Sequence, residues 1–163
     1  MTQSLNITSK IISVTVNNES YSLNVNSNET LLEILRNKLQ IKSIKAACWQ
    51  GDCGICTILL EGKPVKSCLV LAWEVHERSI LTVEGLMDGK NLSKLQEAFI
   101  RNGAIQCGFC TSAFLLMGHY LLSKGEPLSR ESIKDSLNGI LCRCTGYSDL
   151  IESIYEVYLD SYK

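Results

Sequence analysis

The eight cysteines are the residues of this chain with the clearest capacity for chemistry, and they form two groups of four. The N-terminal group follows the pattern C-x4-C-x2-C with a fourth cysteine downstream: Cys48, Cys53, Cys56 and Cys68. The C-terminal group joins C-x2-C to C-x-C: Cys107, Cys110, Cys142 and Cys144. Cysteines as close as the last two rarely form a disulfide with each other, whereas two thiolates on one turn can bind the same metal centre. The pattern therefore indicates metal ligation.

The spacing of the first group is that of plant-type ferredoxins, in which four thiolates hold a two-iron, two-sulfide cluster. One loop has to wrap such a cluster, with backbone N–H groups directed at its sulfides. Gly51 and Gly54 suit this loop, because glycine adopts left-handed backbone conformations and permits close approach. We expect the fourth ligand, Cys68, to come from a strand that the loop has passed over.

In the second group, Cys107-Gly-Phe-Cys110 is expected at the start of one helix and Cys142-Arg-Cys144 at the end of another. The dipole of a helix favours an anionic cluster at the helix N-terminus. Arg143, between two ligands, would either offset part of the negative charge of the cluster or face solvent.

Two other uses of the cysteines remain open. One is a disulfide scaffold, although disulfide-dense scaffolds are usually shorter than this chain and belong to exported proteins. The other is structural zinc, which usually binds two C-x2-C-like pairs or uses histidine. His76 and His119 stand apart from the cysteine pairs, and we expect them to be ordinary surface or core residues. On spacing alone, zinc fits the second group better than the first.

Charge and hydropathy exclude several classes of partner. A net charge of −1 argues against a nucleic-acid-binding surface. Residues 1–10 are polar and lack the apolar segment of a signal peptide, and no run approaches the roughly 20 apolar residues of a membrane span. We therefore expect a cytoplasmic protein that binds neither nucleic acid nor membrane, in a compartment that keeps thiols reduced.

The elements that must position the first group are strands and one helix. Alternating apolar residues predict a β-hairpin over 12–25. Thr30-Leu-Leu-Glu33 matches a capping box, and three leucines fall on one face of the helix of about ten residues that would follow: Leu31, Leu35 and Leu39. After an irregular loop over 44–56, further strands are expected: 57–60, 63–68 and 79–83. These elements predict a small mixed sheet crossed by one helix.

Beyond residue 87 the strand signal gives way to helical spacing. Apolar stripes predict four short helices, with Gly125-Glu-Pro127 breaking the second from the third and Ser148 as the N-cap of the last. We place the boundary at about residue 87, which divides an α+β chain into domains 1–86 and 87–163. The second cysteine group would then lie within a helical bundle.

Three segments together resemble the iron–sulfur component of the molybdenum hydroxylases, the family that includes xanthine dehydrogenase, aldehyde oxidoreductase and aerobic carbon monoxide dehydrogenase. The segments are Cys48 to Cys68, Gln106-Cys-Gly-Phe-Cys110 and Leu141-Cys-Arg-Cys-Thr-Gly-Tyr147. The resemblance extends from about Ile11 to Tyr158. A few positions depart from the usual pattern of the family without touching a cysteine: Ala47, Trp49, Ser112 and Ile140.

The resemblance implies an N-terminal β-grasp ferredoxin domain and a C-terminal four-helix bundle domain, each holding one [2Fe–2S] cluster on its four cysteines. It also implies that the chain is the electron-transfer subunit of a hetero-oligomeric oxidoreductase. A large subunit would carry a molybdopterin-type molybdenum cofactor, and a medium subunit would carry FAD. Electrons would pass from the molybdenum centre through the second cluster and then the first cluster to FAD.

The same resemblance places Gln106 and Cys144 next to the pterin. The chain has no room for the molybdenum or flavin domains, so it would do no substrate chemistry itself, and the complex would oxidise an aldehyde or a related substrate. The alternatives are a free-standing two-cluster electron carrier of the ferredoxin type and a zinc-stabilised interaction module.

Overall fold

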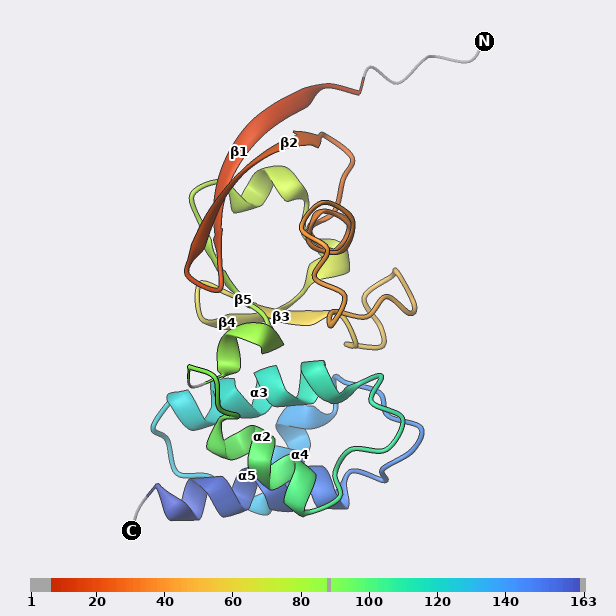
Figure 1. Cartoon of the computed structure of the whole chain (residues 1–163). Coiled ribbons are helices and arrows are strands. Elements are labelled where there is room, and N and C mark those ends of the chain that lie inside the picture. Colours follow the sequence, from red (N-terminus) through yellow and green to blue (C-terminus); the bar gives the residue numbers. More distant parts are fainter. Residues whose placement is uncertain (1–6, 88, 162–163) are drawn as a thin grey trace.

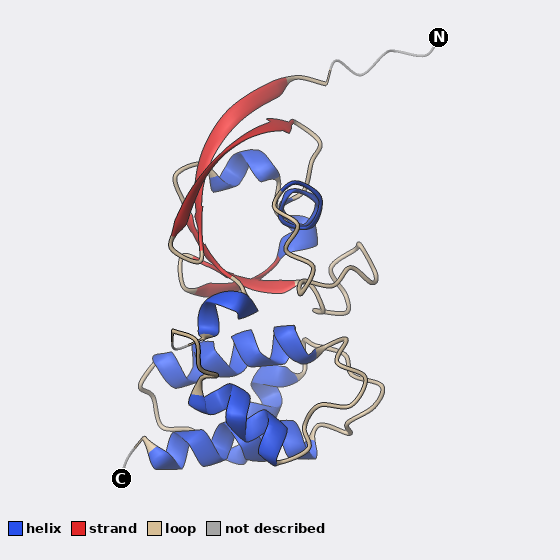
Figure 2. Cartoon of the chain, viewed as in Figure 1, coloured by secondary structure: helices blue, strands red, loops and turns tan. Residues whose placement is uncertain are grey.

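The computed structural model describes residues 7–87 and 89–161 and shows a sheet-containing half followed by a helical half (Figures 1 and 2). Part of the segment in which we expect no signal peptide, residues 1–6, lies outside the described residues, as does residue 88 next to the expected boundary. Among the residues described, no helix is both long and apolar enough to cross a membrane.

The sheet is mixed and has five strands in the order β2-β1-β5-β3-β4. Its strands are β1 (Ser9–Val16), β2 (Glu19–Asn26), β3 (Thr57–Leu60), β4 (Lys63–Lys66) and β5 (Ser79–Leu81). Strands β1 and β5 pair in parallel, and the other neighbours pair antiparallel. This arrangement confirms the expected α+β class with a small mixed sheet.

The predicted hairpin forms because its apolar residues share one face of the strands. Ile12, Val14 and Val16 are all buried on the core side of β1. Asn17 and Asn18 make the turn with φ of 50° and 69°, the left-handed conformation that a two-residue hairpin turn requires and that asparagine tolerates.

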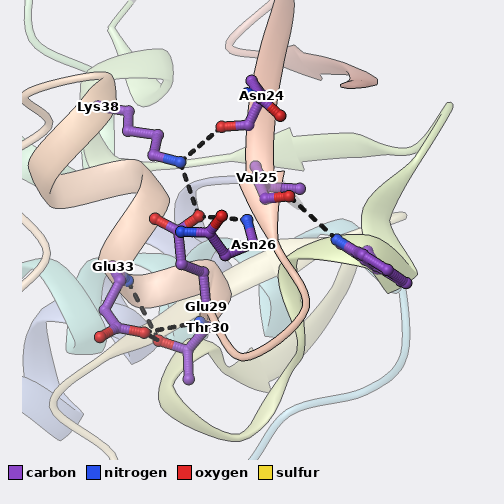
Figure 3. Close-up of polar contacts among 8 residues, drawn as sticks. Asn24, Val25, Asn26, Glu29, Thr30, Glu33 and Lys38 are labelled. Carbon is purple, nitrogen blue, oxygen red and sulfur yellow. Dashed lines mark hydrogen bonds and ion pairs between the residues drawn. The ribbon is translucent and has the colours of Figure 1, made fainter. Parts of the chain in front are cut away.

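The predicted capping box begins the helix of this half (Figure 3). The backbone N–H of Glu33 donates to the Thr30 hydroxyl at 3.3 Å, and the Glu33 carboxylate accepts from the Thr30 N–H at 2.7 Å. Helix α1 (Leu31–Glu33) continues as a π-helical segment, Ile34–Lys38. At its end, Lys38 pairs with Glu29 and donates to the Asn24 carbonyl of β2, which ties the helix to the hairpin.

Two strand predictions were too long. Strand β4 ends at Lys66, and the chain enters a 3₁₀ turn, Ser67–Leu69, because both the N–H and the hydroxyl of Ser67 donate to the Cys56 carbonyl. Cys68 therefore lies on a turn, not on a strand. Strand β5 ends at Leu81 and is followed by a 3₁₀ turn, Val83–Leu86.

The helical half contains the four predicted helices. They are α2 (Lys94–Arg101), α3 (Thr111–Ser123), α4 (Arg130–Leu137) and α5 (Ser148–Asp160). The prediction of Ser148 as an N-cap was wrong: Ser148 is the first residue of α5, and Tyr147, with φ of 70°, occupies the cap position.

Helix α3 is the centre of the molecule. It is buried on almost every side, as expected of a helix that is apolar all round. It contacts β3, β4 and the turn Val83–Leu86 on one side and α2, α4 and α5 on the other (Figure 1). The buried apolar side chains of the sheet and of the helices consequently form one core, and that core places the two cysteine-bearing regions against each other.

Candidate metal centres

The first cysteine set lies on the irregular loop between α1 and β3 and on the turn after β4. All four thiols are free, and three of the four residues are buried: Cys53, Cys56 and Cys68. The Cys53 N–H donates to the Cys48 sulfur at 3.5 Å. The backbone N–H groups of Cys53 and then of Gln50 lower the pKa of Cys48 to about 6. These donors favour negative charge on the sulfur.

The backbone of this loop is left-handed at three positions. Gly51 and Gly54 have φ of 85° and 66°, which confirms the expectation for these glycines. Trp49 also has φ of 60° and is 53% exposed, an unusual backbone conformation for a bulky residue that sequence reasoning missed. The left-handed backbone at these three residues bends the chain into a tight loop between Cys48 and Cys56.

Cys56 and Cys68 form the second pair of this set. The Ser67 contacts with the Cys56 carbonyl bring the turn after β4 beside the end of the loop. Burial, and then the neighbouring Cys56 thiol, raise the pKa of Cys68 to about 11. Cys68 therefore keeps its proton near neutral pH in the metal-free chain, and binding of a metal to its sulfur would release that proton.

The second set also consists of two pairs. The sulfurs of Cys107 and Cys144 lie 3.6 Å apart, and both residues are exposed. Cys110 is buried and contacts Cys142. Burial, and then Cys142, raise the pKa of Cys110 to about 12. Burial opposes a low pKa at Cys142 as well, but hydrogen bonds to its sulfur, first those from the hydroxyl and N–H of Thr145, together lower the pKa of that thiol.

The structure confirms one of the two placements predicted for the second cysteine set. Cys110 is the N-cap of α3, as expected. The prediction that Cys142 and Cys144 end a helix was wrong, because α4 ends at Leu137 and both cysteines lie in the loop 138–147 before α5. Arg143, between them, is exposed. The loop 138–147 runs beside the loop 102–110 at one edge of the helical half (Figure 1).

Tyr147 and Thr145 shape the C-x-C loop. The Tyr147 hydroxyl accepts from the Cys142 N–H at 2.9 Å and donates to the Ile140 carbonyl at 3.1 Å. The N–H and hydroxyl of Thr145 donate to the Cys142 sulfur at 3.5 and 3.2 Å. The Tyr147 ring meets Phe114 of α3 edge to face. These contacts fold the loop back on itself and direct Cys142 toward Cys110.

We expect Tyr147→Phe to destabilise the protein by about 1–3 kcal/mol, because it leaves a backbone N–H and a carbonyl in the loop without their partner. The ring contact with Phe114 would persist. Urea unfolding followed by circular dichroism measures the change. Tyr21→Phe is the matched control: it removes a hydroxyl that bonds Glu19 at the surface, and we expect a change within about 0.5 kcal/mol. Equal effects of the two substitutions would contradict the role of Tyr147.

The pairwise arrangement of the thiols fits two-iron clusters. Each iron of such a cluster takes two thiolates, whereas a structural zinc ion needs four ligands around one point. All four cysteines of the second set, together with Cys53, line one cavity of about 270 Å³. The donors present therefore suit a binuclear iron–sulfur group.

The two histidines have ordinary roles. His76 accepts a hydrogen bond from the Ser13 N–H through Nδ1 at 3.1 Å, next to β1. His119 lies exposed on α3, and partial desolvation by the surrounding protein lowers its pKa.

Comparison with known proteins supports the same assignment. Residues 14–82 match the family described as 2Fe-2S iron-sulfur cluster binding domain, and residues 82–155 match the [2Fe-2S] binding domain family. The chain is 46% identical to the nicotine 6-hydroxylase small subunit of Paenarthrobacter nicotinovorans, over 89% of this chain and 87% of that protein. It is 37% identical to the xanthine dehydrogenase iron-sulfur-binding subunit of Escherichia coli O157:H7, over 89% and 92% of the two chains.

The fold has solved counterparts as well. The crystal structure of quinoline 2-oxidoreductase from Pseudomonas putida 86 contains a chain that superposes with a TM-score of 0.90 at 38% identity, covering 94% of each chain. These matches extend over both cysteine sets and nearly the full length of the described structure. The chain therefore belongs to the family of iron–sulfur small subunits of the molybdenum hydroxylases.

Proposed function

We propose that the eight cysteines bind two [2Fe–2S] clusters, one on Cys48, Cys53, Cys56 and Cys68 and one on Cys107, Cys110, Cys142 and Cys144. The observation that carries this proposal is the division of each set into two thiol pairs, which supplies two ligands for each of two irons. The clusters would supply one-electron redox capacity. The protein would provide the thiolates, the N–H donors and the burial.

In this proposal the chain carries electrons from a molybdopterin-type molybdenum centre on a large partner subunit to FAD on a medium subunit. Its own residues hold the two relay sites next to each other and perform no bond chemistry on substrate. The substrate pocket would belong to the large subunit, so this chain would not select the substrate. Named relatives act in complexes for nicotine and xanthine, and we extend to this chain only their shared electron-transfer role.

The outer pair of the second set is the proposed entry point for electrons. Gln106, Cys107 and Cys144 are all exposed, while Cys110 of the inner pair is buried. An exposed ligand next to an exposed amide suits contact with a pterin held by another subunit. We therefore assign Gln106 and Cys144 as the pterin contacts.

We further propose that the two halves correspond to a β-grasp ferredoxin domain, residues 1–86, and a four-helix bundle domain, residues 87–163. The first half contains the sheet and the second contains helices α2 to α5, and each half has one cysteine set. Eight free thiols suit a reducing compartment such as the cytoplasm.

The rival proposal is a free-standing electron carrier with the same clusters. Native mass measurement after gentle purification separates the two. A subunit of a hydroxylase should elute with larger partners that contain molybdenum and flavin, whereas a free carrier should run as an 18.1 kDa monomer. A stable monomer that is never recovered with such partners would refute the subunit role.

A further inference from the structure

The loops that carry the two cysteine sets meet backbone to backbone at Gly54. A methyl group built on this glycine would collide with the carbonyl oxygen of Gly139 and would lie 3.0 Å from the Ile140 Cα. Gly54 directly follows Cys53, and Ile140 stands two residues before Cys142. The missing side chain therefore lets the two ligand loops touch.

A hydrogen bond joins the same two loops. The Leu141 N–H donates to the Cys53 carbonyl at 2.9 Å. The side chain of Leu141 is 57% exposed, so packing of that side chain does not hold the residue in place. The main chain holds it, and the bond links a cysteine of the first set to the neighbour of a cysteine of the second set.

Neither loop is free to move away from this contact. The Gly54 carbonyl accepts from the N–H and the buried hydroxyl of Thr57, at 3.1 and 2.6 Å. On the other side, the Ile140 carbonyl accepts from the Tyr147 hydroxyl, and Ile140 is buried. A change in shape at the contact would therefore displace the adjacent cysteines.

We propose that Gly54 and Leu141 are positioning residues, each of which fixes the loop of the other cysteine set. The two ligand sets stay separate, but they share one backbone support. The proposal rests on the proposed function, because the two clusters report the geometry of the two loops.

The first test is Gly54→Ala in the full-length protein, purified with its partners. We expect the electron paramagnetic resonance signal and the midpoint potential of the second cluster to shift, although Gly54 belongs to the motif of the first. Two controls isolate the contact. Gly139→Ala adds its methyl group to open space. Gly62→Ala has the same kind of positive φ, 74°, with nothing within 4 Å. Both controls should keep the wild-type signals, and a wild-type second signal in Gly54→Ala would overturn the proposal.

The reciprocal test starts from the second loop. Leu141→Pro removes the N–H that reaches the Cys53 carbonyl, whereas Leu141→Ala keeps it. We expect the signal of the first cluster to shift in the proline variant and to stay in place in the alanine variant. An unchanged first signal in Leu141→Pro would count against the proposal.

A measurement on the unaltered protein covers the case in which the variants do not fold. The Leu141 amide should be protected from deuterium exchange although it lies in a loop. Exchange at the unprotected rate would overturn the proposed support. A protein that binds no clusters would refute the proposed function. The exchange rate of the Leu141 amide would still show whether its hydrogen bond to the Cys53 carbonyl forms.

Discussion

Replacing Cys144 by Ser should remove or distort the second cluster and leave the first intact. Cys144 pairs with Cys107 at the exposed end of its set, 3.6 Å sulfur to sulfur. A serine oxygen is a poor substitute for a thiolate at iron. We expect one of two resolved paramagnetic signals to change or disappear, and electron flow from substrate to slow by at least about tenfold, a barrier increase of about 1.4 kcal/mol.

The matched control is Ser161→Ala, at the C-terminal end of α5, which removes a hydroxyl that donates to the Val157 carbonyl. It should leave both signals unchanged. The first cluster serves as an internal control in the Cys144 variant, because the substitution removes none of its four ligands and keeps the Leu141 N–H that donates to the Cys53 carbonyl. Simultaneous loss of both signals would contradict two separate ligand sets.

Phe114→Ala should produce the largest loss of stability among the substitutions considered. The ring is fully buried in α3 and packs edge to face on Tyr147, with ring centroids 5.8 Å apart. Truncating a buried phenylalanine costs about 3–5 kcal/mol. That is a large fraction of the stability of a small protein, which is about 5–15 kcal/mol. Denaturant unfolding, followed by far-ultraviolet circular dichroism, measures the loss.

Phe109→Ala provides the comparison. Phe109 is 45% exposed on the loop before α3, so the same chemical change should cost less than about 1.5 kcal/mol. The Phe114 variant should also disturb the second cluster, because Tyr147 would lose the ring that supports it. Equal stability of the two variants would show that the core is not centred on α3.

The sequence predicts the elements of the fold well because buried apolar residues recur along the chain with the period of the element that they belong to. Alternation marked β1 through Ile12, Val14 and Val16, and the Thr30–Glu33 box marked the start of α1. No local sequence pattern of this kind indicated the end of β5. Beyond Leu81, the N–H and hydroxyl of Thr82 bond the side chain of Asn17, 65 residues earlier, and the chain turns away from the sheet. An end set by so distant a partner is not visible in the local pattern.

The sequence predicted which residues form the site, but not how their side chains are paired. Cysteine spacing identified the two sets, and glycine at 51 and 54 correctly indicated a left-handed loop. The pairing of individual thiols depends on contacts such as those of Ser67 with the Cys56 carbonyl, which bring distant segments together. The roles of Tyr147 and of the Gly54 contact depend on loops whose paths no periodicity describes. Only the fold shows that Tyr147 supports Cys142.

Metal and acid-labile sulfide analysis of the purified protein, combined with paramagnetic resonance of its reduced form, tests the central claim most directly. Two [2Fe–2S] clusters require about four irons and about four sulfides per chain, with two distinguishable signals after reduction. The pairwise arrangement of the eight thiols predicts that result. Zinc bound in place of iron, with no visible absorption after anaerobic preparation, would contradict it.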